Sequence, residues 1–257
     1  MSIINSFYKG SKPKINVEDL YKKSEIKLDA FIVTFSHKVI MALLEDKLVE
    51  IISEDTIKSI SCSYPIYRFI GTNIGIIKTT IGAPLTAGLI TEVSYVYSCD
   101  KIVIFGSCGS LDKNIIPGSL IVPNAAYRDE GVSYHYMEPS DYIEIPNSSY
   151  ISNFFTNNSI KYVVGKTWTT DAFFRETEEE IKLRRSEGCI TVEMELAACQ
   201  AVANYENLDL YCFLYTADNL DSSSWDRGLR DSILAKDKRL QILNVALKLA
   251  MSITNKQ

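Results

Sequence analysis

The chain has 257 residues, of which 46% are hydrophobic and 23% charged, and its formal net charge is -5 at pH 7. This length and apolar content suit one large core, so we expect a single domain over residues 1–257. The mild acidity excludes a broad basic face for nucleic acid, and no apolar run is long enough to span a membrane.

The spacing of hydrophobic residues predicts the elements of the N-terminal half. They are an N-terminal arm at 1–27 with a short helix near 17–23, a strand at 31–35, a helix from residue 39, a hairpin of 67–70 with 74–77, and a helix at 82–97. The arm lacks the layout of a signal peptide, so we expect a cytoplasmic protein.

The C-terminal half continues the alternation of strands and helices. Strands are predicted at 101–105, at 119–123 where Pro123 ends the strand, at 161–164 and at 210–215, with loops around a short strand at 128–158. Helices are predicted at 176–188, at 195–203 and in a last segment containing Ile233, Leu234, Leu240, Leu243, Leu247 and Met251. The fold class is therefore α/β, a three-layer αβα arrangement with a central mixed sheet.

Six cysteines are scattered without a C-x-x-C pair, mostly inside apolar segments, which predicts reduced and buried thiols. They are Cys62, Cys99, Cys108, Cys189, Cys199 and Cys212. The sequence has no metal-ligand spacing, Walker loop or dinucleotide fingerprint, so we expect no metal and no cofactor.

Three segments carry groups suited to chemistry. The first is residues 105–109, where Gly106 and Gly109 permit close approach of a ligand to the backbone and Ser107 adds a hydroxyl. Its alternative interpretation is a tight strand-to-helix turn. The second holds Glu193 and Glu195 in an apolar setting, where carboxylates need hydrogen-bond donors such as the vicinal hydroxyls of a sugar. Its alternative is the solvated side of a helix start.

The third segment places Asp218 at the end of a buried strand. An aspartate there is well placed as a general acid toward a leaving group. Its alternative role is the N-cap of a following helix.

Together these segments resemble the nucleoside phosphorylase-I family, which includes purine nucleoside phosphorylases, uridine phosphorylases and hydrolytic nucleosidases. The resemblance extends from Pro13 to the last helix and is most specific at residues 192–195, Val-Glu-Met-Glu. It is supported by residues 105–109 and 170–174 and by Asp218. Residues 128–136 look like the corresponding stretch of uridine phosphorylases. The implied fold is phosphorylase-like.

The resemblance implies a role for each matching residue. Glu195 holds the ribose 2'- and 3'-hydroxyls, Met194 packs under the sugar, and Asp218 is the catalytic acid that protonates purine N7. The remaining expectations are Glu193 and His135 at the ribose, Phe173 stacked on the base with Val192 beside it, and Ser107 and Gly106 at the phosphate or nucleophile site. His135 has the alternative of belonging to an aromatic cluster.

Several departures from the family pattern bear on the nucleophile. The family's phosphate-binding arginines match Val39, Ile104 and, from a neighbouring subunit, Ile60, while a phosphate-cradling glycine matches Phe35. Basic groups that can substitute are His37, Lys38, Lys78 and Arg128. His37 lies where hydrolytic relatives carry their water-activating glutamate, with a surface histidine as its alternative.

Two further departures concern recognition. The family histidine that a neighbouring arm contributes matches Lys14, and the glutamine and arginine that recognise uracil fall near Thr177 and Glu179. The retained Asp218 therefore favours purines over uridine.

The leading hypothesis is a nucleoside phosphorylase that uses inorganic phosphate as co-substrate and releases a free base and ribose 1-phosphate. The first alternative is a hydrolytic nucleosidase, and the second a non-catalytic nucleoside-binding or storage protein. The expected partner is a small-molecule nucleoside rather than nucleic acid or a membrane. The family assembles pockets between subunits, so we expect a homo-oligomer, either a dimer or a hexamer.

Overall fold

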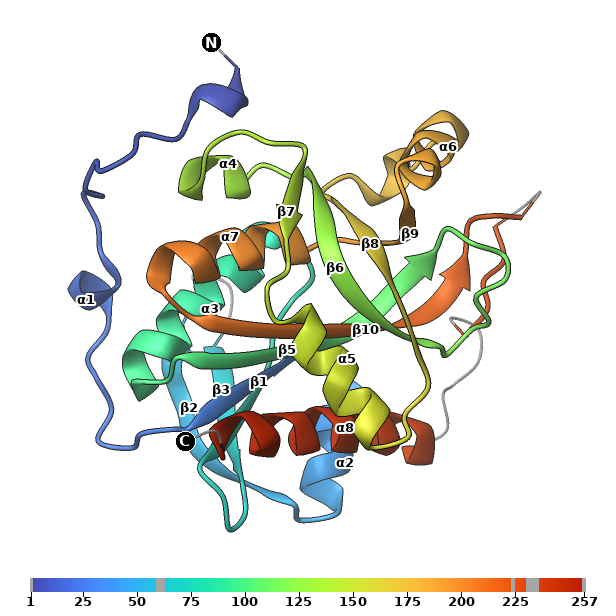
Figure 1. The fold of residues 1–257 in the computed structure, drawn as a ribbon. Helices are drawn as coiled ribbons and strands as arrows, with labels where there is room; N and C mark the ends of the chain where they lie inside the picture. Colours follow the sequence, from blue (N-terminus) through green and yellow to red (C-terminus); the bar gives the residue numbers. More distant parts are fainter. Residues whose placement is uncertain (1, 59–62, 223–224, 230–235, 256–257) are drawn as a thin grey trace.

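A computed structural model describes residues 2–58, 63–222, 225–229 and 236–255. Its ten strands form one sheet with helices on both faces (Figure 1). The strands are β1 (Ala30–Thr34), β2 (Val49–Lys58), β3 (Ser63–Phe69), β4 (Ile74–Lys78), β5 (Lys101–Ser110), β6 (Leu120–Asp129), β7 (Tyr142–Glu144), β8 (Tyr162–Thr170), β9 (Cys189–Glu193) and β10 (Asp209–Asn219).

Among the described residues, two helices are single turns and six are longer segments. They are α1 (Val17–Leu20), α2 (His37–Glu45), α3 (Ala83–Tyr97), α4 (Ser133–Tyr136), α5 (Ser148–Asn157), α6 (Glu178–Ser186), α7 (Leu196–Glu206) and α8 (Lys236–Thr254), with 3-10 turns η1 (Ile3–Asn5) and η2 (Phe173–Arg175).

The sheet closes on itself at one side. Its order is β10-β6-β8-β9-β5-β1-β4-β3-β2, with β7 beside β6, and β10 also pairs with β5. Strands β5, β10, β6, β8 and β9 therefore form a closed ring, from which β1 to β4 extend as an open wing. The expected mixed sheet flanked by helices is confirmed, whereas the ring closure was not predicted, because it depends on β5 pairing with three strands.

Alternation along the central strands decides which helices cover each face. Phe31 and Val33 of β1 belong to the core cluster that contains α3 and α7. Ala30 and Ile32 point the other way, into the cluster formed with α2 and α8. Both faces of β1 are fully buried, which is why its sequence is a continuous apolar run.

The N-terminal predictions agree with the structure. The strand, the following helix, the hairpin and the helix that opens at Gly82 correspond to β1, α2, β3 with β4, and α3. Gly82 has a φ of 118°, which favours glycine, and Pro84 occupies the first turn of α3, where its missing N–H costs nothing. The arm lies along the outside of the fold and contains the single turn α1 (Figure 1).

Four predictions of local structure were wrong or incomplete. Residues 106–110 are not a turn, because β5 continues through them and pairs with β10 and β9. Pro123 does not end its strand: β6 passes it through a register shift, a position that tolerates proline. Strand β2 was not predicted at all. Helix α5 was taken for loop because its serines and asparagines favour turns, yet it buries Ile151 and Phe155.

Five cysteines among the described residues are buried and free. Cys62, Ile60, Ile233 and Leu234 lie outside the described residues.

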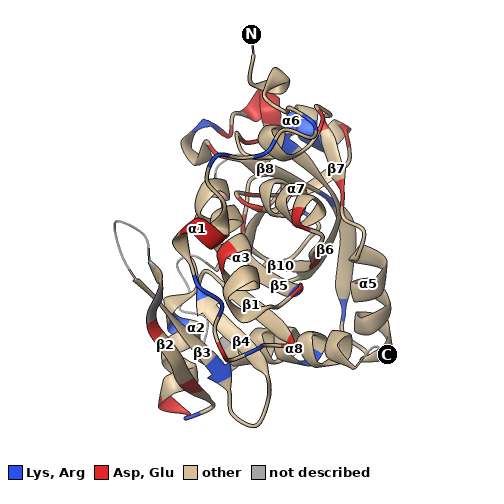
Figure 2. Cartoon of the chain, turned by 90° about the vertical axis from the view of Figure 1, so that its left-hand side faces the viewer, with Lys and Arg blue, Asp and Glu red and all other residues tan. Residues whose placement is uncertain are grey.

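No helix in the described part of the chain has the length and apolar character needed to cross a membrane. Lys and Arg positions and Asp and Glu positions are interspersed along the ribbon, and α6 carries both kinds (Figure 2).

Candidate active site

A cavity of about 330 Å³ lies where β5, β9 and β10 end. Ends of parallel strands are where α/β folds collect ligands. The lining combines apolar and acidic side chains: Phe35, Ile81, Ser107, Cys108, Gly109, Phe173, Glu176, Val192, Glu193, Met194, Glu195, Asp218 and Leu220. The cavity therefore contains the three segments that the sequence analysis singled out.

The two glycines of the first segment make room for neighbouring side chains. A Cβ on Gly106 would lie 2.9 Å from the ring of Phe35. A Cβ on Gly109 would lie 2.6 Å from Leu220 and 3.0 Å from Val192. Such contacts are too close, so glycine at both positions lets these side chains pack directly on strand β5, with Ser107 exposed to the cavity between them.

Glu193 is the last residue of β9, and its carboxylate accepts hydrogen bonds from neighbouring parts of the protein. One oxygen accepts hydrogen bonds from the backbone N–H of Glu195 at 2.8 Å and of Leu196 at 2.7 Å, which are the first donors of α7. The other oxygen accepts from the hydroxyl of Thr169. Glu193 therefore fixes the start of α7 and the position of the neighbouring Glu195.

Glu195 occupies the N-cap position of α7 and faces the cavity. Its carboxylate accepts from the backbone N–H of Gly82 at 2.7 Å and from that of Met194 at 3.3 Å. The side chains of Glu193 and Glu195 are only 7% and 8% exposed. The alternative of two glutamates on a solvated helix start is thus wrong.

Burial shapes the electrostatics of this pair. Desolvation raises the pKa of Glu195 to about 7, against the opposing effect of its two backbone donors. Desolvation and the nearby charge of Glu195 also raise the pKa of Glu193, whereas its three donors act in the opposite direction. Burial likewise raises the pKa of the Cys108 thiol well above its ordinary value, so this cysteine is a neutral wall of the cavity and not a thiolate nucleophile.

Asp218 lies inside β10, one residue before its end, and is 3% exposed. It pairs with Gly109 of β5, and its Oδ2 accepts from the indole N–H of Trp225 at 2.8 Å. The alternative of an N-cap is wrong, because the residues that follow Asp218 continue the strand and then turn back, forming a bridge between Asn219 and Asp226.

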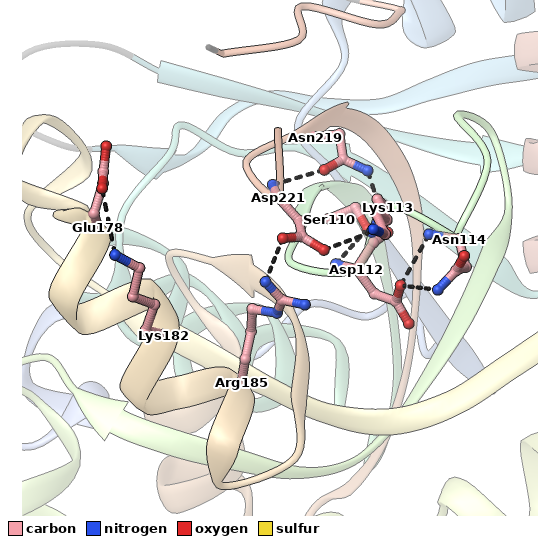
Figure 3. Close-up of polar contacts among 9 residues, drawn as sticks. All are labelled: Ser110, Asp112, Lys113, Asn114, Glu178, Lys182, Arg185, Asn219 and Asp221. Carbon is pink, nitrogen blue, oxygen red and sulfur yellow. Dashed lines mark hydrogen bonds and ion pairs between the residues drawn. The ribbon is translucent and has the colours of Figure 1, made fainter. Parts of the chain in front are cut away.

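Hydrogen bonds and an ion pair connect the end of β10 to neighbouring segments (Figure 3). Asp221 pairs with Arg185 of α6 and accepts from the backbone N–H of Lys113 at 3.1 Å. The backbone N–H of Asp221 donates to Asn219 at 2.7 Å, whose amide in turn donates to the carbonyl of Asp112 at 3.2 Å. Strand β10, the loop after β5 and helix α6 are thereby held together next to the cavity.

Sequence reasoning missed several residues of the lining. Ile81 and Glu176 line the cavity without belonging to any motif. Leu220 belongs to the third segment, residues 215–221, but had no role assigned, and Phe35 had been considered only as the replacement of a glycine. Glu176 lies three residues after Phe173, between η2 and the capping residue Thr177 of α6. An acidic residue between an aromatic pair and a helix start was the available signal.

Other residues expected at the site lie elsewhere in this chain. His37 and Lys38 are exposed on the first turn of α2 and do not line the cavity. Lys78 ends β4 outside the lining. Thr177 caps α6 by exchanging hydrogen bonds with Glu180.

Arg128 is 2% exposed and already has partners. Its guanidinium donates to the hydroxyls of Ser133 at 2.8 Å and Ser140 at 2.9 Å and lies over the ring of Tyr134. His135 lies on helix α4. It lines a separate cavity between α4 and the N-terminal arm. Within one chain, neither residue reaches the acidic cavity.

Charge is one-sided in the acidic cavity. Four carboxyl groups line it, on Glu176, Glu193, Glu195 and Asp218. Among the described residues of this lining there is no lysine, arginine or histidine.

A model of the phosphorylase superfamily matches residues 31–246, which include all of the sheet except Ala30 of β1, and the whole lining of the cavity. The chain belongs to the phosphorylase superfamily.

Phosphorylase superfamily relatives include both modes of cleavage. The chain is 24% identical over 192 residues to a DeoD-type purine nucleoside phosphorylase of Aliivibrio fischeri, covering 72% of this chain and 77% of the relative. Its fold resembles a Toxoplasma gondii purine nucleoside phosphorylase (TM-score 0.75, 16% identity, 98% and 100% of the two chains covered). It also resembles an AMP nucleosidase of Bacteroides thetaiotaomicron (TM-score 0.69, 18% identity, 90% and 91% covered).

This phosphorylase superfamily member thus shares its fold with a purine nucleoside phosphorylase and with an AMP nucleosidase. At these identities the structural likeness establishes the fold alone. The choice of nucleophile and base has to be argued from the cavity itself.

Proposed function

We propose that the chain cleaves the N-glycosidic bond of a purine nucleoside and that water, not inorganic phosphate, takes up the ribosyl group. The observation that carries this proposal is the composition of the cavity. The residues matched to sugar and base recognition line it, whereas Phe35 packs on Gly106 beside Ser107 and the described lining residues include no basic side chain.

The sugar and base sides follow from the arrangement of the lining. Glu195 presents a buried carboxylate, a strong acceptor for two vicinal hydroxyls, with Met194 beside it as an apolar surface. Phe173 supplies an aromatic face for the base. Asp218, on the opposite strand end, is the group available to protonate N7.

Phosphate is disfavoured on electrostatic and steric grounds. A phosphate anion in this cavity would meet four carboxyl groups without a guanidinium or ammonium partner among the described lining residues. Phe35 packs on Gly106, next to Ser107, and occupies the position that the family resemblance gives to a phosphate-cradling glycine. A neutral water molecule meets neither obstacle.

The reaction consumes one water for each nucleoside. The bond between C1' and N9 breaks with its electron pair going to the purine, which Asp218 protonates at N7. The sugar becomes oxocarbenium-like, and the surrounding carboxylates stabilise its positive charge. Water then adds at C1' and loses a proton to a carboxylate of the cavity, giving ribose and a free base.

Phosphorolysis is the second candidate, because the Aliivibrio relative is a purine nucleoside phosphorylase. It requires basic groups from outside this lining, such as those of a neighbouring subunit.

We expect a homo-oligomer, a dimer or a hexamer, acting in the cytoplasm on a small-molecule nucleoside without a cofactor. Light scattering at micromolar concentration tests the assembly, and an active monomer contradicts it.

The function is tested by incubating the protein with adenosine, inosine and uridine, with and without phosphate, and identifying the sugar. We expect free purine and ribose in equal amounts whether or not phosphate is present. Ribose 1-phosphate formed only with phosphate supports the second candidate. Nucleoside binding without any cleavage indicates a storage protein and contradicts both.

A further inference from the structure

We propose that Trp225 is a positioning residue for the acid: its indole holds Asp218 Oδ2, so that Oδ1 carries the proton delivered to the leaving base. This inference rests on the proposed cleavage of purine nucleosides. It concerns a residue that belongs to no motif of the sequence and does not line the cavity itself.

The contact joins a half-exposed ring to a buried carboxyl group. Nε1 of Trp225 lies 2.8 Å from Oδ2 of Asp218, a normal hydrogen-bond distance. Trp225 is 48% exposed and Asp218 3% exposed, so the indole approaches the acid from the solvent side. Asp218 lines the cavity together with Gly109 and Val192, whereas Trp225 does not.

The chemistry of indole makes this contact directional. Its N–H is a donor only, so Oδ2 of Asp218 must be the acceptor in this bond. A proton on Oδ2 would weaken that acceptor, which favours the proton on Oδ1. Oδ1 lies 3.6 Å from the position that a Cβ of Gly109 would occupy, on the strand that lines the cavity. The indole therefore leaves Oδ1, which is buried beside Gly109 of β5, as the oxygen that carries the proton.

The backbone around Trp225 is anchored to the same strand that carries the acid. Asn219 and Asp226 exchange backbone hydrogen bonds of 2.9 and 3.1 Å, and Leu229 donates to the carbonyl of Ala217 at 2.6 Å. At Gly228 the φ is 47°, and a Cβ would lie 2.4 Å from that same carbonyl oxygen. Only glycine fits there, so the return of the chain onto β10 is built into the sequence.

A cation–π contact also holds the ring of Trp225. The guanidinium of Arg227 lies 5.2 Å from the centre of the Trp225 ring, within the range of a cation–π contact. The indole is thus fixed by its backbone, its N–H and its face. Trp225 does not line the cavity, so it acts on the reaction through its hydrogen bond to Asp218.

The test compares two purine nucleosides that differ in their need for an acid. Inosine must gain a proton at N7 as its base leaves, whereas 7-methylguanosine already carries a positive charge on the imidazole ring of its base. For Trp225→Phe, which keeps an aromatic ring but loses the N–H, we expect kcat on inosine to fall about 10- to 100-fold with KM almost unchanged. With 7-methylguanosine we expect less than about a twofold change.

Asp218→Asn is expected to show the same dependence on substrate, since it removes the proton itself. The chain offers a matched control in its other tryptophan. Trp168 also donates its indole N–H to an aspartate, Asp129, at 2.9 Å, but it is buried in β8, and neither residue lines the cavity. Trp168→Phe therefore removes the same kind of bond, and any effect on kcat should be equal for the two substrates.

The outcomes separate the inference from the proposed function. If Trp225→Phe slows both substrates equally, or slows neither, the positioning role is wrong while nucleoside cleavage stands. If the wild type releases no base from either nucleoside, both proposals fail. Loss of inosine cleavage alone, with folding checked by thermal unfolding, supports the role of Trp225.

Discussion

Arg185 of α6 and Asp221, three residues beyond the acid Asp218, form an ion pair that joins two walls of the cavity (Figure 3). The Asp221 side chain is 13% exposed and that of Arg185 41%. Phe173 and Glu176 come just before α6, so the pair links the wall expected to hold the base to the strand end that carries the acid.

Arg185→Gln is expected to raise KM for a purine nucleoside about two- to fivefold, because a partly exposed ion pair contributes little free energy but fixes the relative position of the two walls. Steady-state kinetics measure the change. Lys182→Gln is the matched control: Lys182 pairs with Glu178 one turn earlier on the same helix, with both side chains largely exposed. An equal effect of both substitutions contradicts the role of the Arg185 pair.

Glu195→Gln is expected to lower kcat/KM, because the amide is a weaker acceptor for the sugar hydroxyls than a carboxylate. The expected loss of transition-state stabilisation is about 2 to 4 kcal/mol. The measurement is the initial rate of base release. Glu206→Gln makes the same change at the other end of α7 and is expected to leave the rate unchanged. Near-normal turnover of Glu195→Gln would remove the assignment of this residue to the sugar.

Stability is expected to fall as pH rises from about 5 to about 8. The folded chain holds a proton on Glu195 up to a pKa of about 7, whereas the unfolded chain releases it near the ordinary value of 4.5. Between these values the folded state binds more protons, so its free energy of unfolding decreases with pH, by about 1 to 3 kcal/mol in total. Denaturant unfolding at several pH values measures this slope.

Glu195→Gln removes a titrating group and is expected to flatten the pH dependence of stability. Glu193, whose pKa is shifted in the same direction, accounts for the part that remains. A stability that increases with pH over this range in the wild type contradicts the proposed protonation of the pair.

Phe35→Gly is expected to let phosphate compete with water. Removing the ring uncovers Gly106 beside Ser107, so part of the sugar product should become ribose 1-phosphate at high phosphate concentration. The substitution also costs about 1 to 3 kcal/mol of stability, as expected for a truncated, partly buried aromatic. Phe35→Leu keeps an apolar side chain over Gly106 and should yield ribose alone. The idea fails if the wild type already forms ribose 1-phosphate.

The sequence was informative where strands end. Glu193, Glu195 and Asp218 could be placed near one another because each follows a buried apolar run, and the ends of such strands meet at one edge of a sheet. The continuation of β5 through Gly106 and Gly109 was less predictable. Small residues after a strand normally indicate a turn, and only the packing of Phe35 and Leu220 explains why glycine is needed in a strand here.

The residues that could not be predicted depend on the paths of connecting segments. Ile81 precedes Gly82, and Glu176 lies between two short helical elements. Trp225 lies beside Asp218 because the chain returns onto β10 at the bridge between Asn219 and Asp226. None of these has a periodic pattern or a fixed spacing from a motif. Their roles follow from contacts between positions far apart in the sequence or across a turn.

The ring of five strands has a consequence for biosynthesis. Strand β10 is the last of the ten strands to leave the ribosome, and it fills the gap between β5 and β6. A nascent chain that stops before residue 209 exposes the edges of both neighbours, which invites pairing with other chains. The same strand delivers Asp218. A chain that has covered the edges of β5 and β6 has therefore also placed Asp218. A chain that lacks β10 has exposed edges and no acid.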